Sequence, residues 1–448
     1  MNNFSDIKNA LKDAAKRLGI EKYEIYYQSS SDISTETLKN ELSNFACGNS
    51  AGICFRCIID GKMGYASTEL MDIDEMEQLV LRASQNARYI DSDEQADIFS
   101  GSKTYGTKTS EYAPLPDVSL MKSKALDIQA KNYEQSEYVT DGTQSAVMAY
   151  ETETRIVNSE GLDLANKASM AAAYAAVIIN KDGEPSESIE FANLNDEHKL
   201  QGISAKAYES ALSKLGAGNV ETGTYDIVIS GKQMRSILSA FWSIFSAQSV
   251  RLGTSLLKNK IEAVIASDCV TISDDPFDPE CPIQTTFDAE GMAVYKKNIV
   301  EKGILKTFLY NMSEATRAGV PSTANAYKAS YADTIGIRPY RFAIEPGNNS
   351  LDELFEITQN GLYVTEIKGL HAGANEATGD FSIESAGFVI ENGKKGRPVK
   401  SFTIAGNFYD LLKNITHIEN KIEYGLGGGL NVFASPAILV RNISVAGK

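Results

Sequence analysis

Histidine and cysteine, the side chains that bind most transition metals, are scarce in this sequence. Its 448 residues include three histidines, His198, His371 and His417, and five cysteines. No two histidines are spaced to share one face of a helix, and no H-E-x-x-H run is present. A catalytic zinc site usually has three protein ligands, with neutral imidazole prominent among them. The sequence therefore predicts no metal site in this chain.

The cysteines suggest neither a disulfide framework nor a zinc knuckle. They are odd in number in a long chain without an expected export signal, which favours reduced thiols and a cytoplasmic location. Cys54 and Cys57 form a C-x-x-C, but they lie inside an expected strand, where residues three apart point to opposite faces. We expect two buried thiols there.

Basic residues and long apolar runs are also in short supply. Lys and Arg number 43 against 59 Asp and Glu, which gives a formal net charge of −16. Affinity for nucleic acid comes largely from cations that neutralise phosphates, so we expect no direct nucleic-acid binding. The longest apolar run, 170–179, has ten residues, whereas a bilayer-spanning helix needs about 20. We therefore expect no membrane segment.

The patterns that are present repeat in the first half of the chain. An amphipathic helix, strands that end in a tight hairpin, and a second helix occur twice in the same order. The expected helices are 5–18, 73–90, 118–134 and 199–213, and the expected hairpin turns are 60–61, 160–161 and 182–183. We interpret 1–215 as an N-terminal domain with an internal duplication, 1–95 and 115–215.

A second domain is expected over 225–448, after a linker at 215–224. Its expected elements are a hairpin that turns at 302–303 and helices at 312–318, 351–360 and 407–414. Strands joined by tight turns favour antiparallel sheet. The predicted fold class is therefore α+β, with duplicated helix-plus-hairpin units and mixed sheet in the N-terminal part and mostly antiparallel sheet with helices in the C-terminal domain.

The run SILSAFWSIFSAQS, at 236–249, predicts a helix with two unlike faces. Large hydrophobic residues gather on one face, and serines and alanines gather on the other. Small residues let another backbone approach closely, so we expect a buried packing helix. Serine chemistry is disfavoured, because no general base lies nearby in the sequence and no G-x-S-x-G is present.

Two glycine-bearing loops are candidates for binding. GLGGGLNV, at 425–432, lacks the frame of a phosphate-binding loop, so Gly427, Gly428 and Gly429 more simply allow a peptide main chain or a partner subunit to come close. GLHAGANEATGD, at 369–380, contains His371, the histidine best placed for a function. A surface or capping role is the alternative for His371.

The stretch 378–415 resembles the C-terminal signature of the TldD/PmbA family. The matching runs are T-G-D-F at 378–381, I-E-N-G at 390–393, P-V at 398–399 and T-I-A-G-N at 403–407. D-A-E-G at 288–291 and E-K-G-I-L at 301–305 are similar to two further family segments. The resemblance covers the chain from 225 onward and, more loosely, the first half.

The resemblance implies a subunit without the family's zinc site. The TldD kind resembles a zinc peptidase with an H-E-x-x-x-H helix and a late cysteine ligand. Counting from Tyr225 places the three helix positions at Ser239, Ala240 and Ile244, and 424–429 contains no cysteine. The T-I-A-G-N form matches the PmbA kind, also called TldE, which is thought to pair with TldD. Zinc is then expected only in a TldD-type partner.

The implied function is that of a non-metal subunit of a cytoplasmic metallopeptidase complex for small or unfolded peptides. The family label of modulator of DNA gyrase is then explained by processing of a peptide rather than by contact with DNA. Alternatives are a homodimeric peptide-binding or scaffold protein, and a hydrolase built on His371, Asp380 and Glu384. The residues expected to bind substrate or a partner are His371, Thr378, Gly379, Asp380, Gly406, Asn407, Gly427, Gly428 and Gly429.

Overall fold

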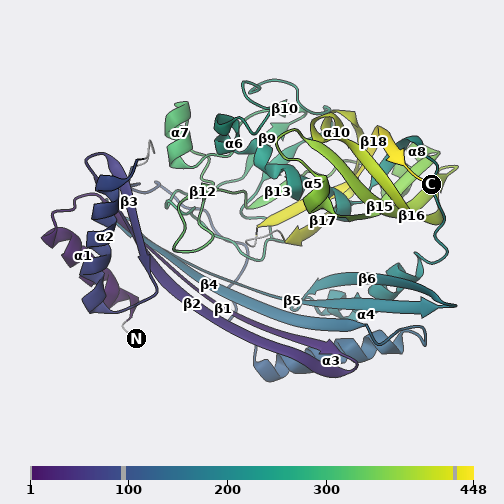
Figure 1. Ribbon diagram of the computed structural model, residues 1–448, viewed down its shortest axis with the longest axis horizontal. Helices are drawn as coiled ribbons and strands as arrows, with labels where there is room; N and C mark the ends of the chain where they lie inside the picture. The colour runs from purple at the N-terminus through teal and green to yellow at the C-terminus, as the bar shows by residue number, and fades with distance from the viewer. Residues whose placement is uncertain (1–2, 92–96, 427–430) are drawn as a thin grey trace.

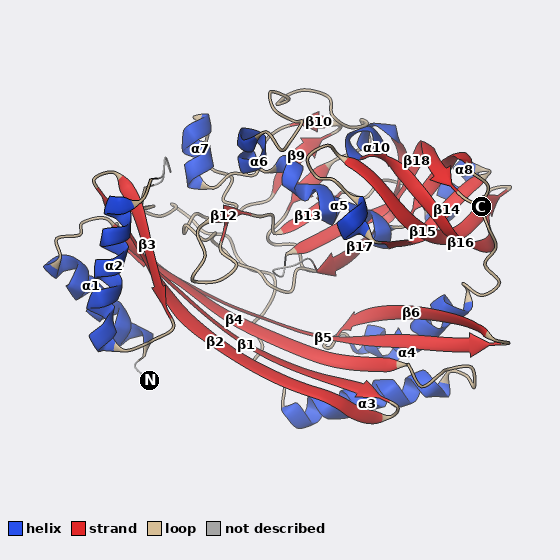
Figure 2. Cartoon of the chain, viewed as in Figure 1, coloured by secondary structure: helices blue, strands red, loops and turns tan. Residues whose placement is uncertain are grey.

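The computed structural model describes residues 3–91, 97–426 and 431–448 as two packed α+β parts (Figure 1). A long, curved antiparallel sheet with helices on its outer face forms the first half, and a more compact mixed sheet forms the second (Figure 2). The α+β class predicted from the sequence is confirmed. Within the described residues, no helix is long and apolar enough to cross a membrane.

The first sheet has the order β3-β2-β1-β4-β5-β6, with antiparallel neighbours throughout. The predicted hairpin turns at 60–61, 160–161 and 182–183 all occur, and each contains a glycine with positive φ. The strands are β1 (Tyr23–Leu38), β2 (Glu41–Ile59), β3 (Lys62–Thr68), β4 (Gln144–Asn158), β5 (Asp163–Lys181) and β6 (Glu184–Asn193). Each half contributes three strands and two helices, while a common origin of the halves stays a prediction.

Amphipathic helices cover the outer face of this sheet because their apolar stripes pack on the alternate side chains of the strands. They are α1 (Phe4–Arg17), α2 (Met76–Tyr89), α3 (Val118–Glu134) and α4 (Glu197–Leu212), close to the predicted ranges. The apolar periodicity of the sequence also predicts that Leu18 and Ile73 face inward, and both predictions are wrong. Leu18 is 38% exposed because α1 ends at Arg17, and Ile73 is 42% exposed because it lies in a 3-10 turn before α2.

The two cysteines of the C-x-x-C are buried on opposite faces of β2, as predicted. Cys57 packs in the cluster beneath α1 and α2. Cys54 packs on the other face, with Tyr26 of β1 and Phe287 of the second domain. The pair therefore cannot chelate one ion, and Cys54 instead helps to join the two domains.

The second domain is built around strands that close on themselves. β7 pairs with β14 on one side and with β18 on the other, and β14, β15, β16 and β18 are neighbours in that order. Most pairings are antiparallel, whereas β14–β7 and β13–β18 are parallel. The main strands are β7 (Gly223–Ile229), β14 (Gly361–Lys368), β15 (Asp380–Glu391), β16 (Lys394–Asn407), β17 (Ile415–Leu426) and β18 (Val432–Ala446).

Shorter strands and helices complete this domain. β8 (Ile272–Asp274), β9 (Lys297–Glu301), β10 (Ile304–Leu305) and β13 (Arg341–Ile344) extend the sheet, and β11 (Ala326–Tyr327) pairs with β12 (Gly336–Ile337). The helices are α5 (Gly231–Phe241), α6 (Ala247–Leu252), α7 (Met312–Ala318), α8 (Leu351–Thr358), α9 (Leu370–Gly373) and α10 (Phe408–Asn414). The structure contains the predicted hairpin at 302–303, formed by β9 and β10. It also contains the predicted helices at 312–318, 351–360 and 407–414, which are α7, α8 and α10.

Candidate functional site

Helix α5 has the two faces that the sequence predicted, but only one of them is buried. Met234, Ile237, Leu238 and Phe241 are completely buried, and the Phe241 ring stacks on Phe408 at 4.7 Å between centroids. The helix is followed by a 3-10 turn at Trp242–Phe245. The opposite face carries partly exposed side chains. They are Lys232, Arg235, Ser236 and Ser239 on α5, together with Ser243 in the turn that follows.

The expectation of a buried packing helix is therefore wrong for this second face. Periodicity identifies an apolar stripe, but it does not determine whether another element covers the small residues. Here the serine-bearing face is half-open, as is suitable for contact with an extended chain or another subunit.

An open groove lies at the C-terminal end of this face, with a cavity volume of about 740 Å³. Ser243, Ser249 and Thr254 line one wall, and residues 372–377 and 380–382 line the other. Ser243 Oγ donates a hydrogen bond to the Glu376 carboxylate and so bridges the two walls. Hydroxyls, an amide and two carboxylates make this groove polar.

The predicted T-G-D and G-N residues come together beside the groove. The Asn407 amide donates to Asp380 Oδ1 and to the Thr378 carbonyl, both at 2.9 Å. Hydrogen bonds from Asn407 and Thr378 hold the pKa of Asp380 below its usual value. Phe381 pairs with Gly406 across β15 and β16. These contacts fix the loop that carries Asp380 into the groove.

Gly379 has a conformational reason for being glycine. Its φ is +82°, and a Cβ atom there would lie 2.6 Å from the ring of Tyr409. The Phe408 N–H donates to the Gly379 carbonyl at 2.7 Å, so the turn is anchored to the start of α10. Gly379 is thus required by local structure, and a direct role in binding stays a prediction.

Other predicted site residues are not brought together. His371 lies exposed on α9. Asp380 lines the groove, whereas Glu384 lines a second cavity of about 410 Å³ between the β5–β6 hairpin and β14–β16. The three side chains of the alternative hydrolase therefore do not share a cavity. Gly427, Gly428 and Gly429 lie outside the described residues.

The positions matched to the zinc-binding helix do not fit a metal. Ser239 and Ala240 are partly exposed on α5, and Ile244 is completely buried in the core. The guanidinium of Arg235 rests on Gly425 of β17, so α5 is adjacent to the late strand. A hydroxyl, a methyl group and a buried isoleucine are not zinc ligands. Among the described residues, no cluster of three or more His, Cys, Asp or Glu side chains is placed to hold a metal ion.

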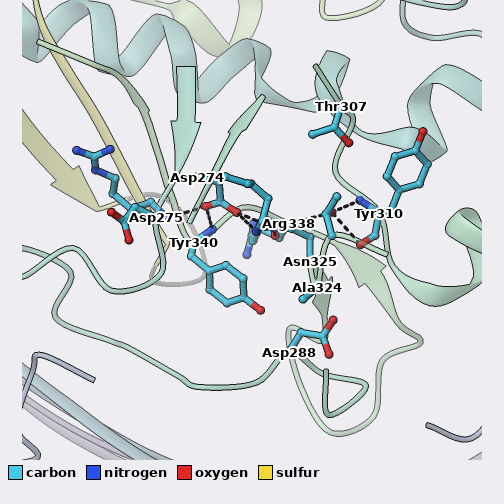
Figure 3. Close-up of polar contacts among 12 residues, drawn as sticks. Asp274, Asp275, Asp288, Thr307, Tyr310, Ala324, Asn325, Arg338 and Tyr340 are labelled. Atoms are coloured by element: carbon cyan, nitrogen blue, oxygen red, sulfur yellow. Dashed lines mark hydrogen bonds and ion pairs between the residues drawn. The ribbon is translucent and has the colours of Figure 1, made fainter. Parts of the chain in front are cut away.

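A buried polar network that no sequence pattern indicated supports the second domain (Figure 3). Asp274 Oδ2 accepts from the Asn325 amide at 2.7 Å and from Lys297 at 3.2 Å. Its other oxygen accepts from the main-chain N–H groups of Tyr340 and Arg341. The network joins β8, β9 and β13 to the turn at 323–325. Its residues are far apart in sequence, so spacing carries no signal for it.

A second missed cluster lies where the two domains meet. Arg56 Nε donates to Glu24 Oε1 at 2.8 Å, and both side chains are at most 2% exposed. The D-A-E-G run of the second domain faces this pair. Burial, together with the nearby Asp288 carboxylate, raises the pKa of Glu290 to about 8, although Arg56 opposes the shift. The run was recognised as a family segment, but its place at the domain boundary was not.

Three domain models of one protein family match most of this chain. Residues 23–87 match PmbA/TldA metallopeptidase domain 1, residues 113–215 match the central domain, and residues 222–447 match the C-terminal domain. These matches cover both the curved sheet and the closed sheet.

Individual relatives agree with the domain matches. An uncharacterized protein of Methanocaldococcus jannaschii is 29% identical over 413 residues, 90% of this chain and 92% of that protein. Metalloprotease PmbA of Escherichia coli O157:H7 is 24% identical over 420 residues, 89% of this chain and 88% of that protein.

Solved structures share the same fold over nearly the full length. A Thermotoga maritima protein labelled as a modulator of DNA gyrase superposes with a TM-score of 0.90 at 26% identity, covering 99% of this chain and 100% of that one. TldE of Thermococcus kodakarensis superposes with a TM-score of 0.83 at 22% identity, covering 98% and 100%. The second likeness concerns the fold alone.

Proposed function

The chain belongs to the PmbA/TldD family of metallopeptidases, and from this premise we propose that it is a non-metal, PmbA/TldE-type subunit of a cytoplasmic TldD/TldE-like peptidase complex. In this role it handles small or unfolded peptides next to a zinc-bearing TldD-type partner. By itself it is inert toward peptide bonds.

One observation carries the proposal. Helix α5 and β17 are adjacent, yet the side chains at Ser239, Ala240 and Ile244 supply no nitrogen, sulfur or carboxylate ligand. A zinc-bound water needs such ligands in order to be held and activated. The chain thus retains the adjacent helix and strand, α5 and β17, but lacks the metal ligands that zinc-dependent hydrolysis requires.

The rest of the molecule supplies walls for an extended substrate. The curved sheet lies beneath the second domain in Figure 1. The groove at the end of α5 is lined by helical and loop residues. Enclosing walls admit unfolded chains and exclude folded proteins. The net charge of −16 favours peptides over nucleic acid as ligands.

The proposal is tested by purifying the chain alone and after co-expression with a TldD-type chain that contains H-E-x-x-x-H. We expect the chain alone to contain no stoichiometric zinc and to leave an unfolded peptide intact. The co-expressed pair should elute as one complex and cleave the peptide, and a chelator should remove the activity. One tightly bound zinc per isolated chain, together with chelator-sensitive cleavage, would contradict the proposal.

The same measurement separates the alternative function. A stable homodimer that binds peptides but ignores the TldD-type chain would assign a stand-alone peptide-binding or scaffold role. The matched control is the partner with its two motif histidines replaced by alanine, which should still form the complex but lose cleavage. This control distinguishes a catalytic contribution of the partner from simple stabilisation.

A further inference from the structure

Among the described residues, Arg235 is a partly buried cation without a hydrogen-bond or ion-pair partner. Its Nε atom is buried and has no hydrogen-bond partner, and no ion pair of this side chain is found in the described part of the chain. Burial lowers the pKa of Arg235. Removing a charge from water costs free energy unless another group compensates it. An anion bound from outside would recover that cost.

Of the two carboxylates near Arg235, Glu190 pairs with other cations, and Glu423 lies beyond ion-pair distance. Glu190 of β6 pairs with Lys206 at 2.7 Å and also lies 3.9 Å from Lys232. The stem of Glu423 on β17 packs against Gly231 at the start of α5. Both carboxylates act on Arg235 only from beyond ion-pair distance. The guanidinium is therefore available to an external carboxylate.

The position of the guanidinium is defined by β17. A Cβ atom on Gly425 would lie 1.3 Å from Arg235 Nη1, so only glycine allows the guanidinium to rest on this strand. One helical turn earlier, Lys232 Nζ donates to the Ile189 carbonyl on the edge strand β6. Arg235 thus lies on α5 against β17 and near β6, where the two domains approach each other.

The surroundings suit the end of a peptide. On β6, Ile189 and Phe191 are 38% and 59% exposed, and the Phe191 ring contacts Tyr174 at 5.8 Å between centroids. In the other direction, the serine face of α5 leads to the polar groove at Ser243. From Arg235 the helix runs to Phe241, and the 3-10 turn that follows contains Ser243. The distance along the axis is roughly 13 Å, the length of about four residues of extended chain.

We propose that Arg235 binds the C-terminal carboxylate of a peptide whose last residues lie along the serine face of α5. Arginine suits this task because its planar fork can donate two parallel hydrogen bonds to one carboxylate. A terminal carboxylate is an anion that unmodified peptides carry whatever their sequence. The inference rests on the proposed function, because it names the part of the peptide that this subunit holds.

The test measures binding of the full chain to fluorescein-labelled, unstructured decapeptides by anisotropy. One peptide ends in a free carboxylate, the second is the same sequence with a C-terminal amide, and the third is amidated but ends in glutamate. We expect the free acid to bind at least tenfold more tightly than either amide, because neither amide places a charged acceptor at the chain end for the guanidinium.

Variants locate the effect. Arg235→Gln should reduce affinity for the free acid to that for the amide, and Gly425→Ala should do the same by displacing the guanidinium. Arg82→Gln, which removes an exposed charge from α2, is the control and should change nothing. Circular dichroism checks that each variant is folded.

The outcomes separate this inference from the proposed function. Equal binding of acid and amide, or unchanged preference in Arg235→Gln, would overturn the carboxylate site while leaving peptide handling intact. If the glutamate-ended amide bound as tightly as the free acid, Arg235 would bind a side-chain carboxylate, and the proposed C-terminal site would be overturned. Absence of binding to all the peptides would count against both proposals.

Discussion

At the scale of single residues, the buried carboxylate of Asp274 is stabilised by several hydrogen-bond donors at once. Asp274 is completely buried and accepts hydrogen bonds from two side chains and two main-chain N–H groups. A carboxylate can be buried at tolerable cost only when its lone pairs are satisfied in this way. Removing it would leave Lys297 as a buried cation without its counterion.

Asp274→Ala should therefore destabilise the second domain by about 3–5 kcal/mol, as expected when one partner of a buried ion pair is removed. The single tryptophan, Trp242, lies in this domain, so its fluorescence during urea unfolding reports the change. Asp13→Ala on the exposed side of α1 is the control and should shift stability by less than about 0.5 kcal/mol. Equal shifts in the two variants would show that the network contributes little.

At the scale of elements, α5 joins the core of the second domain to its half-open site. Its apolar face packs inside the closed strands, and the stacked rings of Phe241 and Phe408 connect α5 to α10. Because α10 begins immediately after Asn407, this contact also positions the residues that hold Asp380. Packing on one face of the helix thus determines the geometry near the other face.

Phe241→Ala should cost about 3–5 kcal/mol through the lost contacts and the cavity left in the core. It should also weaken any binding that depends on the loop at 378–380, since α10 loses its support. Leu252→Ala is the control, because Leu252 is 61% exposed on α6. Thermal unfolding and peptide binding of both variants check the expectation, and a Phe241→Ala protein as stable as Leu252→Ala would refute it.

At the scale of the whole molecule, the domains meet through a buried mixture of apolar and charged groups. Tyr26 and Cys54 of the curved sheet pack on Phe287 of the second domain. Beside them, Glu24 and Arg56 face two acidic residues, Asp288 and Glu290. Burial raises the pKa of Asp288 and of Glu290. Docking of the domains therefore depends on how many protons these acids hold.

The sign of this dependence follows from the raised pKa. Glu290 changes from an ordinary value of 4.5 to about 8 on folding, so the folded state holds more protons between those two pH values. The contribution of Glu290 to the free energy of unfolding is thus greatest below about pH 4.5, and it is lost as the pH rises through about 8. Neighbouring Asp288 acts in the same direction.

Glu290→Gln should therefore stabilise the protein more at pH 9 than at pH 6. The expected difference exceeds about 1.4 kcal/mol, the equivalent of one pKa unit. Urea unfolding at the two pH values measures it, with Glu301→Gln at an exposed position as the control. An identical effect of Glu290→Gln at both values would disprove the titration of this carboxyl.

Local patterns predicted most elements of the fold. Turn glycines, apolar stripes and strand alternation are properties of neighbouring residues, and they correctly placed the hairpins at 60–61 and 182–183 and the helix at 312–318. The same local information placed Thr378, Gly379 and Asp380 in one loop. Local patterns failed at Leu18 and Ile73. Both residues lie just outside the regular helix, so the helical period of the apolar residues did not determine whether their side chains are exposed.

The sequence by itself determined the elements, the family and the lack of zinc-binding side chains at Ser239, Ala240 and Ile244, because residue identity and short-range spacing contain that information. Only the tertiary structure decided that the serine face of α5 stays half-open, that Arg235 rests on Gly425, and that D-A-E-G meets Arg56. Those relations join residues far apart in the chain, and they arise from packing, which no local pattern specifies.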